Sequence, residues 1–140
     1  MGMVASNPQF ISWILKVKSN VDSGQFKPAM LAAAAALDAD DSWFGNLNEA
    51  YTERRALAEQ IMTALGCTFD PGQRGMFLWG RVPDSVDDIE AFCDRILQQA
   101  RVFLTPGFIF GSNGDRYIRI SLCASPARLT EALKRISQPE

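Results

Sequence analysis

The sequence contains no histidine among its 140 residues. Histidine is the side chain that most often acts as a general base near neutral pH, and it activates the Ser or Cys nucleophile of many enzymes. It is also the commonest metal ligand, zinc included. Its absence excludes Ser–His and Cys–His nucleophile pairs and a histidine zinc site. Any chemistry must therefore use Lys, Arg, an acidic side chain, Tyr or a cofactor.

Cysteines are few and lie far apart in the sequence. Cys67, Cys93 and Cys123 are odd in number and fit no metal-ligand spacing. This pattern is typical of reduced thiols in a cytoplasmic protein. We therefore expect neither a disulfide framework nor a metal site, and we expect a cytoplasmic location.

Long runs of one charge or of apolar residues are also missing. Fourteen Lys and Arg against 16 Asp and Glu give a net charge of -2, with no long basic run, so nucleic-acid binding is not expected. The longest aliphatic run, MLAAAAAL at 30–37, is too short to cross a bilayer. The first residues do not resemble a secretory signal, so no membrane or secretory role is expected.

The hydrophobic periodicity that is present divides the chain into two parts. Residues 1–66 predict helices without a sheet, whereas residues 67–140 alternate strands and helices. The helices are expected at 6–18, 29–39, 41–65, 84–100 and from 125 onward, and the strands at 67–70, 76–82, 102–106 and 116–123. This order predicts an α+β fold, in which a small, mostly antiparallel sheet is covered by helices.

An arginine stands in the middle of the last predicted strand. In DRYIRISLC (115–123), Ile118, Ile120 and Leu122 would share one face, and Arg119 the other. Arginine is almost never fully buried unless it is paired, and its planar fork fits a carboxylate through two parallel hydrogen bonds. Its partner is therefore either an acid of this chain, such as Asp115 or Asp70, or a carboxylate that arrives from outside.

Four stretches, in this order, resemble the C-terminal third of class I/II aminotransferases, the fold-type-I enzymes that use pyridoxal 5′-phosphate. They are NPQFISWILKVKSN, NEAYTERRALAEQIMTALG, PGQRGMFLWGRVP and VFLTPGFIFGSNGDRYIRISLC. The last stretch is the most specific, because it resembles the family's V-x-x-x-P-G-x-x-F-G-x-x-G-x-x-(Y/F)-x-R-(I/L)-S in one register. The matching residues are Pro106, Gly107, Phe110, Gly111, Gly114, Tyr117, Arg119 and Ser121.

The resemblance implies a function and a set of site residues. The parent enzyme would transfer an amino group between an amino acid and a 2-oxo acid, as a homodimer. Arg119 would bind the α-carboxylate of the substrate, and Phe77 would form a side wall of the same pocket. Lys18, Asn20 and Ser23 lie in a segment that, in related enzymes, reaches the active site of the other subunit.

The same resemblance places the catalytic machinery outside this chain. The lysine that forms a Schiff base with pyridoxal 5′-phosphate and the arginine that holds its phosphate belong to a family segment upstream of the part matched here. Residues 1–66 would then link this part to a large domain and pack against it, and residues 67–140 would form the C-terminal small domain. We expect no catalytic residue in this chain and no transaminase activity from the chain alone.

Two other functions remain open at this stage. Carbon–sulfur lyases of the same fold share the arginine of the last strand, so Arg119 does not separate them from aminotransferases. A non-enzymatic ligand-binding or dimerisation module is a further alternative, and carboxylate binding without cofactor binding would favour it.

Overall fold

In the computed structural model, which describes residues 2–138, the chain divides between Gly45 and Asn46 into two compact units. The first contains α1 (Pro8–Val21), α2 (Lys27–Leu37) and the start of α3 (Asp41–Ala64). The second contains the rest of α3 and all the strands. The expected division of the parent enzyme after residue 66 is a different boundary and stays a prediction.

Helix α1 begins where the sequence predicts and ends three residues later than predicted. The Asn7 side chain caps it by accepting a hydrogen bond from the backbone N–H of Gln9 at 2.9 Å, and Pro8 stands in the first turn. At its other end, Lys18 forms an ion pair with Asp22 one turn further along, and the Asp22 N–H donates to the Lys18 carbonyl at 2.9 Å. These contacts extend the helix to Val21.

Helices α1 and α2 contain no buried residue. Most of their large apolar side chains are instead exposed. These are Phe10, Trp13, Ile14, Leu15, Val17, Val21, Met30, Leu31 and Leu37. Packing of these helices on a large domain of the parent enzyme stays a prediction.

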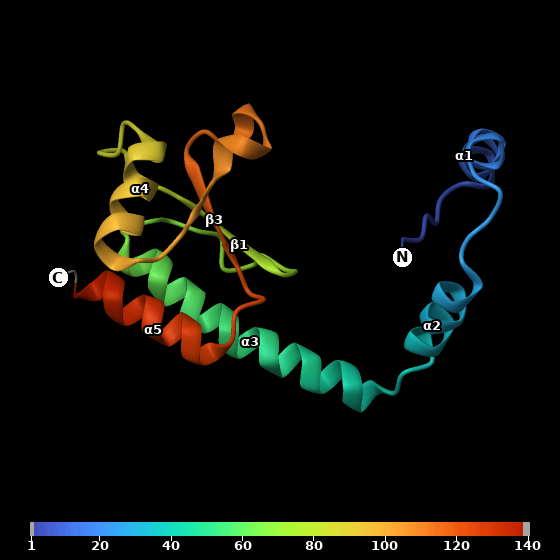
Figure 1. The fold of residues 1–140 in the computed structure, drawn as a ribbon, viewed down its shortest axis with the longest axis horizontal. Helices are drawn as coiled ribbons and strands as arrows, with labels where there is room; N and C mark the ends of the chain where they lie inside the picture. The colour runs from blue at the N-terminus through green and yellow to red at the C-terminus, as the bar shows by residue number, and fades with distance from the viewer. Residues whose placement is uncertain (1, 139–140) are drawn as a thin grey trace. The chain divides into compact units, whose positions relative to one another are not determined.

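The sheet of the second unit is antiparallel and follows the strand order β1-β3-β2. Its strands are β1 (Phe77–Arg81) and β3 (Tyr117–Ser121), both labelled in Figure 1, and the two-residue β2 (Thr105–Pro106). Ile118 and Ile120 are buried, whereas Arg119 between them is half-buried on the opposite face. The alternation predicted for the last strand is therefore confirmed, and so is the α+β fold with a small antiparallel sheet covered by helices.

The core lies on the Ile118 face of the sheet. It is formed by alternate residues of β1 and β3 together with the C-terminal half of α3, α4 (Ile89–Ala100) and α5 (Pro126–Ser137) (Figure 1). Its most deeply buried large side chains are Ile61, Met62, Leu78, Val82, Ile118 and Leu122. Burial on this face leaves the other face of the sheet to Arg119 and its neighbours.

The strand predicted at 67–70 does not form. Thr68 makes a single bridge with Arg81, through backbone hydrogen bonds of 2.9 and 2.7 Å. The next hydrogen-bonding position on that edge of β1 is Trp79, and the Gln73 side chain occupies it. The Gln73 amide nitrogen donates to the Trp79 carbonyl at 2.8 Å, and its oxygen accepts from the Trp79 N–H at 2.9 Å.

Helix α4 begins at Ile89, later than the predicted start at residue 84 or 85. Asp84 accepts a hydrogen bond from Arg81 at 2.6 Å, and Arg116 donates to the carbonyls of Pro83 and Val86. These bonds hold the segment in a non-helical turn, so Asp88 caps the helix instead, by accepting from the Ala91 N–H at 3.0 Å.

The strand predicted at 102–106 is shorter than expected. Only Thr105–Pro106 pairs with β3, and two short 3-10 helices follow, η1 (Gly107–Phe110) and η2 (Ser112–Gly114). Across residues 2–138, no helix has the length and apolar character needed to span a membrane. The same residues contain no group of three or more potential metal ligands.

Candidate functional site

Arg119 lies on the central strand, on the face of the sheet that the core leaves free. It stands opposite Trp79 of β1 and opposite Thr105 of β2. The ion pairs found among residues 2–138 join Lys18, Arg81, Arg116 and Arg135 to acids, and none involves Arg119. The intramolecular alternative of Asp115 or Asp70 as its partner is therefore absent from the structure.

Aromatic rings surround the Arg119 guanidinium in place of an acid. Its Cζ atom lies 4.1 Å from the ring centroid of Phe77, 4.0 Å from that of Phe110 and 5.9 Å from that of Trp79. We call these three rings the aromatic cradle. A guanidinium is attracted to the negative face of an aromatic ring, so the cradle holds the cation in place without neutralising its charge.

Two elements position the cradle. Phe77 and Trp79 alternate with buried residues along β1, so both point to the Arg119 face. Phe110 comes from η1, and its ring meets Trp79 edge to face, with 5.4 Å between centroids and an interplanar angle of 72°. The cradle therefore joins β1 to the turn that follows β2.

The glycines of the turn allow η1 and η2 to approach each other through their backbones. A Cβ atom at Gly107 would lie 2.5 Å from the Gly114 carbonyl oxygen and 2.7 Å from that of Tyr117. Only a residue without a side chain fits such contacts. Because this packing sets the path of the turn, it also sets where Phe110 meets Arg119.

Sequence reasoning named Arg119 and Phe77 as candidates, and their role in binding a carboxylate stays a prediction. It did not predict that Trp79 and Phe110 contact Arg119. The structure brings Arg119 and Phe77 into contact, as the resemblance implies. Trp79 could have been found, because it stands two residues after Phe77 and so shares its face of the strand. Phe110 is part of the quoted motif, but the contact depends on the turn geometry, which the residue types do not specify.

Lys18, Asn20 and Ser23 lie in the first unit, and their side chains are exposed. The segment is less of a loop than predicted, because Lys18 and Asn20 belong to the last turn of α1. The Asn20 side chain donates to the Lys16 carbonyl at 2.6 Å. The expected role of these three residues at the active site of a partner subunit stays a prediction.

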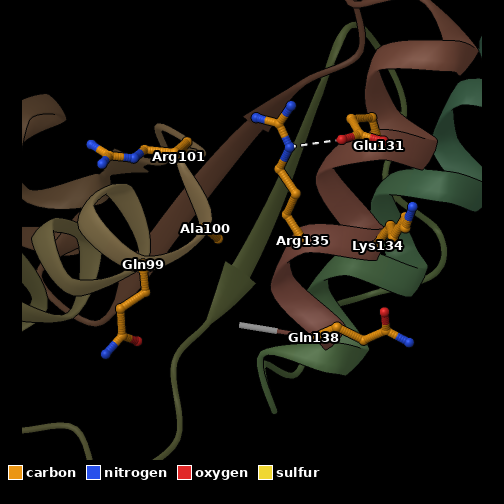
Figure 2. A pocket seen from close by; sticks show the side chains of 7 residues that line it. All are labelled: Gln99, Ala100, Arg101, Glu131, Lys134, Arg135 and Gln138. Carbon is orange, nitrogen blue, oxygen red and sulfur yellow. Dashed lines mark hydrogen bonds and ion pairs between the residues drawn. The ribbon is translucent and has the colours of Figure 1, made fainter. Parts of the chain in front are cut away.

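A hollow of about 530 Å³, away from Arg119, lies between the C-terminal end of α4 and α5 (Figure 2). It is lined by Gln99, Ala100, Arg101, Glu131, Lys134, Arg135 and Gln138. Figure 2 shows the polar ends of Arg101, Gln99 and Lys134 pointing in different directions, while Arg135 donates to Glu131 at 2.8 Å. These groups do not converge on one point, so the hollow has no ligand-binding geometry.

The resemblance implies that the cofactor lysine lies outside this chain, so the surroundings of its four lysines are of interest. Lys16, Lys18, Lys27 and Lys134 are all exposed. An amine that forms a Schiff base at neutral pH needs a pKa lowered by burial or by a neighbouring cation. Over residues 2–138 the structure thus contains a candidate carboxylate site, and the expected absence of the cofactor lysine stays a prediction.

Comparison of the sequence with curated proteins finds similar aminotransferases. The chain is 34% identical over 137 residues to the LL-diaminopimelate aminotransferase of Oleidesulfovibrio alaskensis. The aligned residues make up 98% of this chain and 35% of that protein. For the enzyme of the same name from Aquifex aeolicus, the identity is 33% over 136 residues, covering 97% and 35%. The chain therefore spans about a third of the length of the curated relatives it matches.

Solved structures give the same result. The apo structure of BacF from Bacillus subtilis matches with a TM-score of 0.78 and 31% identity, over 94% of this chain and 35% of that one. The probable N-succinyldiaminopimelate aminotransferase of Thermus thermophilus matches with a TM-score of 0.78 and 30% identity, over 91% and 34%. The resemblance to a C-terminal part of a fold-type-I aminotransferase is thereby confirmed. The family described as aminotransferase class I and II matches residues 1–136, and this chain belongs to that family.

Proposed function

We propose that this chain supplies the substrate-carboxylate site of a pyridoxal phosphate-dependent aminotransferase. The observation that carries the proposal is the state of Arg119, which is held by the aromatic cradle and has no acidic partner among residues 2–138. A permanently charged fork that is fixed in place and not neutralised is suited to a carboxylate that arrives from outside.

Each residue has a distinct part in this proposal. Arg119 binds both oxygens of the α-carboxylate and so fixes the orientation of the α-carbon. Phe77 forms the wall beside the bound carboxylate, and the cradle excludes water from one side of the ion pair, which strengthens it. Pyridoxal phosphate, when bound in the parent enzyme, supplies the electron sink for the chemistry at that carbon.

The identity of the parent enzyme is part of the same proposal. We place its cofactor-binding lysine and phosphate-binding arginine outside residues 1–140, so the chain alone is inactive. The substrates are an amino acid and a 2-oxo acid, and the names of the curated relatives favour a diaminopimelate-type amino acid. We further propose a homodimer in the cytoplasm, in which Lys18, Asn20 and Ser23 approach the partner's active site.

The test compares carboxylate and carboxamide substrates in the aminotransferase that contains this segment. For Arg119→Met, kcat/KM for the amino acid should fall by about 10- to 100-fold, because charge-assisted hydrogen bonds contribute about 1.5–3 kcal/mol. The same variant should lose the preference for the amino acid over its α-carboxamide, whereas Arg119→Lys should keep part of it. If Arg119→Met discriminates as well as the unmodified enzyme, the carboxylate is bound elsewhere.

Product analysis in the same assay separates the two enzyme classes. A 2-oxo acid formed only when an amino acceptor is present identifies a transaminase. Pyruvate and ammonia released without an acceptor would instead identify a carbon–sulfur lyase of the same fold.

A further inference from the structure

Two adjacent arginines of α3 contact the ends of the two strands that form the carboxylate site. Arg55 Nη2 donates to the Gly75 carbonyl at 2.8 Å, and Arg54 Nη1 donates to the Leu122 carbonyl at 3.3 Å. Gly75 comes two residues before Phe77, and Leu122 comes three residues after Arg119. Helix α3 is thus hydrogen-bonded both to the segment just before β1 and to the segment just after β3.

The segment before β1 and the segment after β3 are also hydrogen-bonded to each other. The Leu122 N–H donates to the Met76 carbonyl at 2.9 Å, directly beyond the last paired position of the sheet, Phe77 opposite Ser121. Together with the two arginine bonds, this makes a closed set of contacts between α3, the segment before β1 and the segment after β3. The set lies at the end of the sheet where Phe77 contacts Arg119.

Arg54 and Arg55 differ from the arginines that form ion pairs among residues 2–138. Both guanidinium groups are partly buried, and their hydrogen bonds go to carbonyls rather than to an acid. Arg54 Nε and Arg55 Nη1 are buried without a partner among residues 2–138. Hydrogen bonds from a charged donor are stronger than those between neutral groups, so these two bonds fix the carbonyls of Gly75 and Leu122 in place.

We propose that Arg54 and Arg55 are positioning residues, which hold Phe77 in contact with Arg119 by fixing the backbone on both sides of this pair. The proposal rests on the assigned role of Arg119 as the carboxylate-binding residue. In physical terms, Arg55 fixes where β1 begins, and Arg54 fixes where β3 ends. If either bond is lost, the Phe77 ring moves relative to the guanidinium, and the carboxylate is presented to a less well oriented fork.

The experiment follows the Nε–H signal of Arg119 by NMR in the 140-residue chain, with Arg119→Lys used to assign it. Because the guanidinium lies against Phe77 and Phe110, ring currents should displace this signal from the value of a solvated arginine. In Arg55→Met and Arg54→Met, the difference between the Arg119 signal and that of a solvated arginine should become smaller. It should return in Arg55→Lys, whose amine reaches the same Gly75 carbonyl. Should a methionine variant fail to fold, Arg55→Gln replaces it, since it keeps a donor on a shorter side chain.

Arg116→Met is the matched control. Arg116 is also partly buried and donates to two backbone carbonyls, those of Pro83 and Val86, but it lies at the opposite end of β3. The Arg116→Met variant should lower the melting temperature about as much as Arg55→Met does, and it should leave the Arg119 signal in place. Equal shifts in Arg55→Met and Arg116→Met, or no shift in either arginine variant of α3, would overturn the proposal.

A titration of the same samples with pyruvate distinguishes this inference from the proposed function. If pyruvate moves the Arg119 signal, the affinity should be weaker in Arg55→Met than in the unmodified chain and unchanged in Arg116→Met. Pyruvate could leave the Arg119 signal unmoved while Arg55→Met still brings that signal closer to the value of a solvated arginine. In that case the positioning role stands and carboxylate binding by Arg119 fails. If Arg55→Met binds pyruvate more weakly but its free Arg119 signal stays where it is in the unmodified chain, the result would count against positioning through Phe77.

Discussion

The Cζ atom of Arg119 lies 4.0 Å from the centroid of the Phe110 ring, although the two residues belong to a strand and to the turn before it. Phe77 lies at almost the same distance, 4.1 Å, and comes from the neighbouring strand. The cation is thus held by rings from two separate elements. Its position therefore depends on the register of β1 against β3 and on the path of the turn.

Replacing Phe110 with leucine should weaken the hold on Arg119 without unfolding the chain. Cation–π contacts of this kind contribute about 0.5–1 kcal/mol at exposed sites, and Phe110 is 48% exposed. We expect a fall of about two- to fivefold in kcat/KM of the parent enzyme, the factor that corresponds to this energy. The assay is the same comparison of carboxylate and carboxamide substrates that tests Arg119.

Phe108→Leu is the control for this substitution, because Phe108 lies on the same short helix and is 39% exposed. It should leave kcat/KM unchanged. An equal loss in both variants would mean that the helix as a whole matters rather than the ring over Arg119.

Replacing Gly107 with alanine should destabilise the second unit. The added Cβ would meet backbone oxygens of Gly114 and Tyr117 at 2.5 and 2.7 Å, and backbone cannot move aside as a flexible side chain can. We expect a loss of about 1–3 kcal/mol in the free energy of unfolding, the usual cost of overpacking. Urea denaturation followed by circular dichroism measures it.

Gly45→Ala provides the opposite case in the same assay. Gly45 lies in α3 with nothing within 4 Å of an added Cβ, so alanine should favour the helix by roughly 0.5–1 kcal/mol. A stabilising Gly107→Ala would show that η1 and η2 do not pack as the structure has them.

The elements that the sequence predicts well are those whose information is local. Ser125 and Pro126 mark the start of α5, which is where the helix begins. The alternation around Arg119 predicts both faces of β3, because one face is buried and a strand has a period of two. In each case the residues that determine the structure are neighbours in the chain.

The predictions that fail depend on residues far away in sequence or on side chains competing for backbone groups. The strand at 67–70 looks regular in sequence, but the Gln73 amide takes the edge of β1 that it would need. The start of α4 is delayed because Arg116, about 30 residues away, holds the carbonyls of Pro83 and Val86. Residue types do not reveal such long-range bonds.

The candidate site divides in the same way. Arg119 and Phe77 follow from motif resemblance, and their contact agrees with it. The bonds from Arg54 and Arg55 to backbone carbonyls were not predictable, because the pair reads equally well as an exposed part of a helix. A side chain that binds backbone leaves no pattern of its own in the sequence.

The stability of the chain should fall in alkaline solution because of two buried thiols. Burial raises the pKa of Cys67 and of Cys93 from 9.0 to about 11. Above pH 9 these thiols ionise in the unfolded chain and stay protonated in the folded one, which favours unfolding. Their contribution is complete below about pH 9 and is lost as the pH rises through about 11, as urea denaturation at pH 8, 9, 10 and 11 would measure.

Alanine variants distinguish the effect of the buried Cys67 and Cys93 from that of the exposed Cys123. The double variant Cys67→Ala, Cys93→Ala should be less stable at every pH but show a flatter decline above pH 9. Cys123 is exposed, so Cys123→Ala should keep the decline of the unmodified chain. A decline that is equally steep in the double variant would assign the alkaline instability to other groups.

Reduction of the 140-residue chain with borohydride after incubation with pyridoxal 5′-phosphate should give no single stoichiometric phosphopyridoxyl-lysine. All four lysines are exposed, and Lys18 is already paired with Asp22, so no lysine of residues 2–138 is enclosed in a pocket that could hold a phosphate beside it. Peptide mass spectrometry should find only partial, scattered labelling. An intact class I/II aminotransferase treated in the same way provides the positive control, with one labelled lysine. One clean adduct on Lys16, Lys18, Lys27 or Lys134 would show that this chain holds the cofactor itself, and the division of labour proposed for the parent enzyme would be wrong.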